Sequence, residues 1–185
     1  MKTIANILRV AAFLAAFSPV GIFAANLSFG PVHMIGDGAQ VNLSVVSYQR
    51  HDVIEAMKRG MEIRIIYEIQ IRRAAGGFLA GNKTVYSKTI TRKVKFDFWG
   101  KAFQVMEGKK SIVFQSESAM LDYFFSLRDY ELPGLALRGG ESYAMRAKVE
   151  LKSVELYFPM NLIFKYLVGF WDFDTGWVNG PPVGY

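Results

Sequence analysis

The sequence predicts a mainly β fold: an antiparallel β-sandwich or open barrel of about seven or eight strands, with two or three short helices. A long alternation of apolar and polar residues runs from 61 to 72, and a second runs from 142 to 156. This period of two places one face of a strand in a core and the other in water. Aromatic residues make up 15% of the chain, which favours strands and a thick core.

The first part of the chain predicts a hairpin and then a long strand. Two short apolar-rich runs, 26–34 and 41–48, flank the sequence Gly36-Asp37-Gly38, which is typical of a hairpin turn. The clearest strand is 61–72, in which every second residue is apolar: Met61, Ile63, Ile65, Tyr67, Ile69 and Ile71. A small-residue turn at 74–77 follows it.

The later part predicts two more long strands and a second hairpin. Residues 83–98 form a long run that is compatible with a strand, and 142–156 form the last one. Between them, 102–106 and 111–114 flank a turn at 107–110 that contains a glycine. We expect the three long strands to form the centre of the fold.

Two short helices are expected between these strands. Asp52-Val-Ile-Glu55 has the pattern of a capping box and Gly60 that of a helix terminator, so a helix is predicted over 52–59. A second helix is predicted over 117–126 from the helical spacing of Met120, Leu121, Phe124 and Phe125.

The C-terminal part, about 159–185, forms an apolar and aromatic tail. From Met160 to Trp171, nine of twelve residues are apolar, and Pro159 suits the first turn of a third helix. Twelve helical residues span only about 18 Å, too little to cross a bilayer. We expect this helix to lie in the core, at a partner interface or in a membrane surface.

The first 25 residues have the plan of a secretory signal peptide. Lys2 and Arg9 precede an apolar run at 10–17, and small residues at Ala24 and Ala25 offer a cleavage site. We therefore expect a cleaved signal peptide, a periplasmic or secreted protein, and a single β-rich domain over 26–185. An uncleaved N-terminal anchor is the alternative.

Composition excludes several classes of chemistry. The chain of 185 residues has no cysteine and only two histidines, His33 and His51. Disulfides, thiolate metal sites and cysteine nucleophiles are thus excluded, and we expect no metal and no cofactor. Without residues 1–25 the chain has 20 Lys and Arg against 16 Asp and Glu, a mildly basic balance. It suits an acidic partner or peripheral contact with an anionic membrane, whereas nucleic acid is not expected.

Two groups of residues are candidates for an interaction site. The first is a basic region on adjacent strands, formed by Arg72, Arg73, Lys88, Arg92, Lys93 and Lys95. It is either a solvated sheet face, paired with Glu62 and Glu68, or a surface for an anionic head group or partner. The second is in the tail: Trp171, Asp172, Phe173, Asp174 and Trp177.

The tail group has two possible roles. Either its aromatic side chains fill an edge of the core while its carboxylates stay solvated or cap turns, or the group is a recognition site. Asp172 and Asp174 would point the same way on a strand and perturb each other's pKa. They are also the last pair of carboxylates that could support catalysis.

Three stretches of the chain resemble a bacterial family of secreted proteins, the domain of unknown function 4390 family. They are residues 54–68 (IEAMKRGMEIRIIYE), 90–97 (ITRKVKFD) and 170–177 (FWDFDTGW). The resemblance covers most of 26–180 and implies an envelope location and a β-rich domain. It implies no activity, and no catalytic residues are carried over.

These observations predict a non-enzymatic protein of the cell envelope that binds another envelope protein or a membrane component. The first alternative is a carrier of lipid or small apolar ligands, with a cavity between sheet and helices. An enzyme that uses Asp172 and Asp174 is a further alternative. The last is a small outer-membrane β-barrel, suggested by the terminal Tyr185 and opposed by Pro181 and Pro182.

Overall fold

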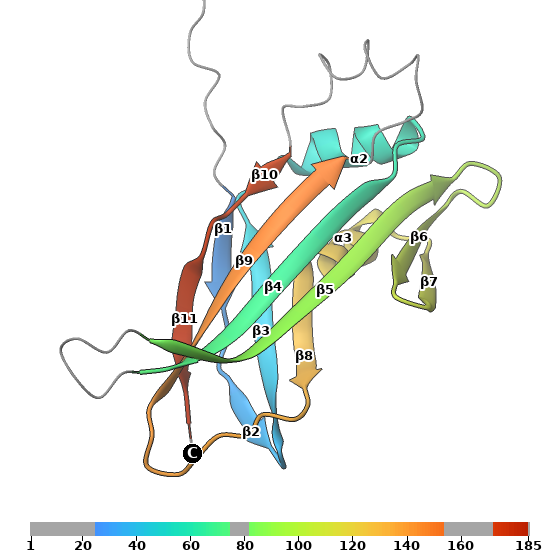
Figure 1. Ribbon diagram of the computed structural model, residues 1–185. Helices are drawn as coiled ribbons and strands as arrows, with labels where there is room; N and C mark the ends of the chain where they lie inside the picture. Colours follow the sequence, from blue (N-terminus) through green and yellow to red (C-terminus); the bar gives the residue numbers. More distant parts are fainter. Residues whose placement is uncertain (1–24, 75–81, 154–171, 185) are drawn as a thin grey trace, which may run out of the picture.

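Two antiparallel β-sheets pack around one hydrophobic core (Figure 1). The structure is a computed structural model, and it describes residues 25–74, 82–153 and 172–184. The prediction of a mainly β fold is confirmed, and the described chain takes the two-sheet arrangement of a sandwich.

The small sheet contains β1 (Asn26–Phe29), β2 (His33–Ile35), β3 (Gly38–Val46) and β8 (Ser126–Leu132). β1 and β2 both pair with β3, and β8 also pairs with β3. Ile35 is opposite Gly38, so the hairpin predicted at residues 36–38 is confirmed. Strand β8 was not predicted from the sequence, because it begins directly after a helix and carries three charged residues.

The large sheet has the order β10-β9-β4-β5-β6-β7, with β11 also paired to β9. Its strands are β4 (Ile63–Arg73), β5 (Lys83–Asp97), β6 (Ala102–Glu107), β7 (Lys110–Phe114), β9 (Tyr143–Ser153), β10 (Phe173–Asp174) and β11 (Val178–Val183). The three predicted long strands are β4, β5 and β9, and they are neighbours at its centre. The β6–β7 hairpin is also confirmed. The described chain has 11 strands, more than expected, because several are short.

Both helices predicted before residue 154 are present. Helix α2 (Arg50–Lys58) lies at the end of the sandwich where β4 begins, and α3 (Glu117–Phe125) contacts β6, β7 and β8 (Figure 1). Gly60 follows α2 with a φ of +90°, as expected for a helix terminator. The helix predicted over 160–171 lies outside the described residues.

The predicted capping box at Asp52 is wrong. Helix α2 begins two residues earlier, at Arg50, with Gln49 as the N-cap and no side-chain cap. Asp52 is therefore inside the first turn, where its negative charge still complements the helix dipole. Helix α3 does have a side-chain cap: Ser116 Oγ accepts from the Ala119 N–H at 3.4 Å.

The core lies between the sheets and is supplied by alternate residues of their strands. In β4 the core residues are fully buried: Ile63, Ile65, Tyr67, Ile69 and Ile71. From the small sheet, Val41 and Leu43 pack in the same cluster. The opposite face of β4 is polar and half-buried. We call this face of the large sheet, away from the small sheet, the outer face.

Candidate functional site

Strand alternation divides the predicted basic region between two faces of the large sheet. Residues directly opposite each other in neighbouring strands share a face. Lys88 is opposite Ile69 and Arg92 is opposite Ile65, and both isoleucines are buried in the core. Lys88 and Arg92 thus lie on the inner face of the large sheet, which is the face towards the small sheet. The expectation that the basic residues share one solvated face is therefore wrong for these two.

Arg92 is a core residue, with only 3% of its surface exposed. Its Nε donates to Glu107 Oε2 at 2.6 Å, and its Nη1 donates to the Ser126 carbonyl at 2.7 Å and to the Tyr123 carbonyl. The guanidinium carbon lies 4.1 Å from the centre of the Tyr123 ring. A cation at the C-terminal end of α3 also complements the helix dipole. Arg92 therefore joins the two sheets and is not available to a partner.

Arg73 is also engaged within the fold. It lies at the last position of β4, and its Nη1 pairs with Glu141 Oε1 at 2.8 Å. Glu141 in turn accepts from the Tyr143 hydroxyl at 2.6 Å. That hydrogen bond, and then Arg73, hold the pKa of Glu141 below its ordinary value. Arg73 thus fixes the segment before β9.

Arg72, Lys93 and Lys95 are the predicted basic residues that do lie on the outer face. Lys93 Nζ pairs with Glu62 at 3.4 Å, as expected for a solvated sheet face. Lys95 is exposed. Arg72 is half-buried, and its Nη2 donates to the Asn82 carbonyl at 2.9 Å.

Another cationic group on the outer face is Arg146 of β9, which the sequence analysis did not single out. Its Nε and Nη2 donate to Gln70 Oε1 at 2.9 and 2.6 Å. Its guanidinium carbon lies 4.3 Å from the centre of the Trp177 ring. Two hydrogen bonds and a stacked ring fix the plane of the guanidinium.

Arg72 lies beside this group. Arg146 is opposite Gln70 and Ala144 is opposite Arg72, so the two arginines are diagonal neighbours across β9 and β4. Burial, and next the charge of Arg72, lowers the pKa of Arg146. We call Arg72, Arg146, Gln70 and Trp177 the arginine–tryptophan platform.

Membership of a family is decided by the sequence comparison. The model of the family described as Domain of unknown function (DUF4390) matches residues 31–179. The chain belongs to the DUF4390 family. The three stretches that carried the resemblance all fall within this match. No curated protein and no solved structure matches the chain.

The DUF4390 match includes all four residues of the arginine–tryptophan platform and the predicted tail residues. Of the latter, Phe173 packs against the core, and Trp177 is 39% exposed on the platform. Trp171 lies outside the described residues. The tail from Phe173 to Val183 is thus part of the large sheet, where it pairs with β9 as β10 and β11.

The two tail carboxylates have separate structural partners. Asp172 accepts from the Ser153 N–H at 2.8 Å and from its hydroxyl at 3.3 Å, and burial raises the pKa of Asp172. Asp174 accepts from the Gly176 N–H at 2.8 Å and pairs with Lys148 Nζ at 3.1 Å. The groups that shift the pKa of Asp172 are thus its burial, then Ser153 and Lys152.

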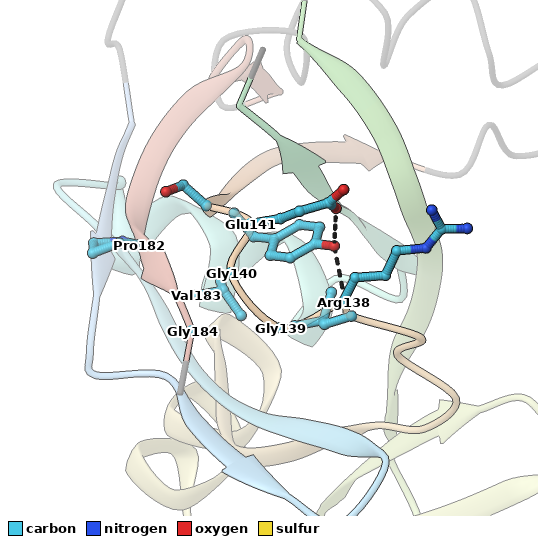
Figure 2. Close-up of a pocket in the computed structure, with 10 residues that line it drawn as sticks. Arg138, Gly139, Gly140, Glu141, Pro182, Val183 and Gly184 are labelled. Carbon is cyan, nitrogen blue, oxygen red and sulfur yellow. Dashed lines mark hydrogen bonds between the residues drawn. The ribbon is translucent and has the colours of Figure 1, made fainter. Parts of the chain in front are cut away.

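A hollow of about 440 Å³ lies at the opposite end of β9, around its first residue Tyr143 (Figure 2). Arg138, Gly139, Gly140 and Glu141 line one side, and residues 182–184 line another. The Arg138 N–H donates to the Tyr143 hydroxyl at 2.9 Å, so the polar groups here bind each other. The lining mixes charged side chains with glycine backbone, which suits a turn better than an apolar ligand.

Two further observations concern metal ligands and membrane spans. Among residues 25–74, 82–153 and 172–184, no group of three or more His, Asp or Glu side chains could hold a metal ion. Within the same ranges, no helix is both long and apolar enough to pass through a membrane.

Proposed function

We propose that this protein is a non-enzymatic binding protein of the cell envelope, and that its outer face binds an acidic surface of another envelope protein. The observation that carries the proposal is Arg146, held by Gln70 against Trp177 beside Arg72. The envelope location rests on the signal-peptide pattern of residues 1–25.

The arrangement of the platform favours an anionic partner. Two guanidinium groups of like charge sit on neighbouring strands, and a carboxylate between them would relieve their repulsion.

The shape of the outer face favours a protein over a small ligand. The platform lies on a broad sheet face formed by β9, β4 and β5, and Trp177 is partly exposed over it. Arginine and tryptophan are the side chains most enriched at the centres of protein interfaces. Because Gln70 already fixes Arg146, little side-chain entropy is lost on binding.

The alternatives have weaker support. A carrier of lipid requires a largely apolar cavity, whereas the polar residues Arg138, Glu141 and Ser142 share the lining of the hollow at Tyr143 with apolar residues. Catalysis by Asp172 and Asp174 requires carboxylates that act together, whereas Ser153 and Lys148 engage them separately.

In-cell photo-crosslinking tests this proposal. A benzophenone amino acid is placed at Thr89, an exposed position of β5 opposite Glu68 on the outer face. The matched control position is Ile35, which is 51% exposed on the small sheet. We expect a discrete protein adduct from Thr89 and none from Ile35. Adducts from Ile35 alone would contradict the proposal.

A further inference from the structure

The turn between β5 and β6 displays two aromatic rings to solvent. Trp99 is 97% exposed and Phe98 is 56% exposed. A tryptophan in this position adds almost no buried area to the fold, so folding stability does not explain it. Exposed aromatic residues that lie together mark a contact surface.

The turn is built to hold this display. The Trp99 N–H donates to Asp97 Oδ1 at 3.0 Å, which fixes the backbone just before the exposed ring. A Cβ at Gly100 would lie 2.7 Å from Asp97 Oδ2, so a larger residue here would displace this carboxylate. The Phe98 ring meets Phe96 edge-on, with ring centres 5.4 Å apart. The backbone that carries the exposed Trp99 ring is therefore held in place.

The aromatic turn lies at one particular end of the sandwich. Ile63, the first residue of β4, is opposite Val94 of β5 and Ser153 of β9. Because β5 continues from Val94 towards the turn, Phe98 and Trp99 lie beyond the start of β4. Phe98 also lies at the end of α2, since its ring is close to Gly60. Figure 1 shows α2, the end of β9 and the β5–β6 turn at the same end of the molecule.

Both apolar stretches of the remaining chain join the domain at this end. Residues 1–24, with the apolar run at 10–17, connect to Ala25 next to β1, whose first residue is opposite Val46 just before α2. Residues 154–171, with nine apolar residues from 160 to 171, connect Ser153 to Asp172, and these two are hydrogen-bonded. The described residues that adjoin these two stretches thus lie at the same end of the sandwich as the aromatic turn.

We propose that Phe98 and Trp99 insert into the surface of a lipid bilayer, with Lys95 and Lys101 on the anionic head groups. Both lysines are exposed and flank the aromatic pair, which is the arrangement of an interfacial anchor. The rings form a projecting tip, which suits insertion among lipids. The aromatic tip lies beyond the start of β4 and the arginine–tryptophan platform lies near its end, so this contact is tested independently of the platform and of the proposed protein partner.

Tryptophan fluorescence tests the insertion directly. The chain has three tryptophans, Trp99, Trp171 and Trp177, so the double variant Trp171→Phe/Trp177→Phe reports Trp99 alone. The chain, in the form that cells produce, is mixed with vesicles of phosphatidylglycerol and phosphatidylethanolamine. We expect a blue shift of the emission and quenching by acyl chains brominated near the head group. Solvent-like, unquenched emission in the presence of vesicles overturns the proposal and makes a protein the occupant of the tip.

Binding measurements with variants test whether the tip contributes to affinity. Trp99→Ala is expected to weaken vesicle binding at least about tenfold. The matched control is Val113→Ala, which removes another apolar side chain, 60% exposed, and is expected to change nothing. Lys95→Gln/Lys101→Gln should weaken binding to anionic vesicles roughly tenfold and leave neutral vesicles unaffected. Unchanged vesicle binding by Trp99→Ala overturns the proposal, because the contact then lies elsewhere on the chain.

Discussion

Arg92 and Glu107 lie opposite each other on β5 and β6, and they form an ion pair inside the sandwich with an Nε–Oε2 distance of 2.6 Å. The same carboxylate accepts from the hydroxyls of Tyr123 at 3.3 Å and Tyr130 at 3.4 Å. Nearby, the Tyr67 hydroxyl donates to the Phe124 carbonyl at 2.7 Å. This polar network joins the large sheet to α3 and β8.

Removal of the Arg92 guanidinium should strongly destabilise the protein. Arg92→Ala leaves Glu107 without its cation and leaves carbonyls at the end of α3 without a donor. Breaking a buried ion pair from one side costs about 3–5 kcal/mol. The free energy of unfolding from urea titration measures this change.

The neighbouring residue gives a matched control. Lys93→Ala removes a cation from the outer face, where its pair with Glu62 is partly exposed. Such pairs contribute about 0–1 kcal/mol. Equal losses in the two variants would contradict the assignment of Arg92 to the core.

Tyr67 should make the fold sensitive to alkali. Burial raises the pKa of Tyr67 above its ordinary value of 10.0, so the folded state keeps the phenol proton that the unfolded chain releases. The free energy of unfolding is therefore expected to fall as the pH rises above 10.0. Tyr67→Phe should lose about 1–3 kcal/mol at neutral pH, because the Phe124 carbonyl loses its donor. Its alkaline decline should be shallower than that of the wild type, and an equally steep decline would contradict this account.

Glu150 should make the outer face sensitive to acid. Hydrogen bonds from Lys148 and then Lys152 hold the pKa of Glu150 below its ordinary value of 4.5. A lowered pKa stabilises the folded state above 4.5, and this contribution is lost as the pH falls through the folded-state pKa. Glu150→Gln should be less stable at neutral pH, with a flatter acid limb in thermal melts. If the stability of Glu150→Gln fell with acid pH as steeply as that of the wild type, Glu150 would contribute nothing to the acid sensitivity.

Truncation tests the place of the tail in the sheet. Deleting residues 172–185 removes β10 and β11 and exposes the edge of β9, and it also removes Val183, which is 2% exposed in the core. Unpaired strand edges promote aggregation. We expect insoluble protein, whereas Asp174→Asn, which keeps both strands, should stay soluble. A soluble, cooperatively folding truncated chain would contradict the assignment.

The sequence predicts the strands and hairpins correctly where an alternation of apolar and polar residues or a turn signal dominates. The alternation in β4 and β9 reflects one buried face, and the glycines of the two hairpins predict their turns. The same alternation could have placed Arg92 in the core, because Ile90 and Val94 share its face. Grouping the basic residues by charge alone concealed the position of Arg92 in the core.

Contacts that depend on how distant strands pair could not be predicted from the sequence. Arg146 meets Trp177 only because β11 pairs with β9, with Asn179 opposite Arg146. Strand β8 is held by contacts from a distant part of the chain: the Asp129 N–H donates to Asn42 Oδ1 at 3.0 Å. No local pattern indicates either pairing.

The most direct test of the outer-face proposal combines crosslinking with the platform. The chain carrying the photo-crosslinker at Thr89 is also given Arg146→Ala, which removes the cation that Gln70 and Trp177 hold. Lys88→Ala is the control, because it removes a cation from the inner face of the same sheet. We predict that Arg146→Ala abolishes the adduct at unchanged protein level and that Lys88→Ala retains it. An adduct of full intensity in Arg146→Ala would contradict the claim that this platform binds the partner.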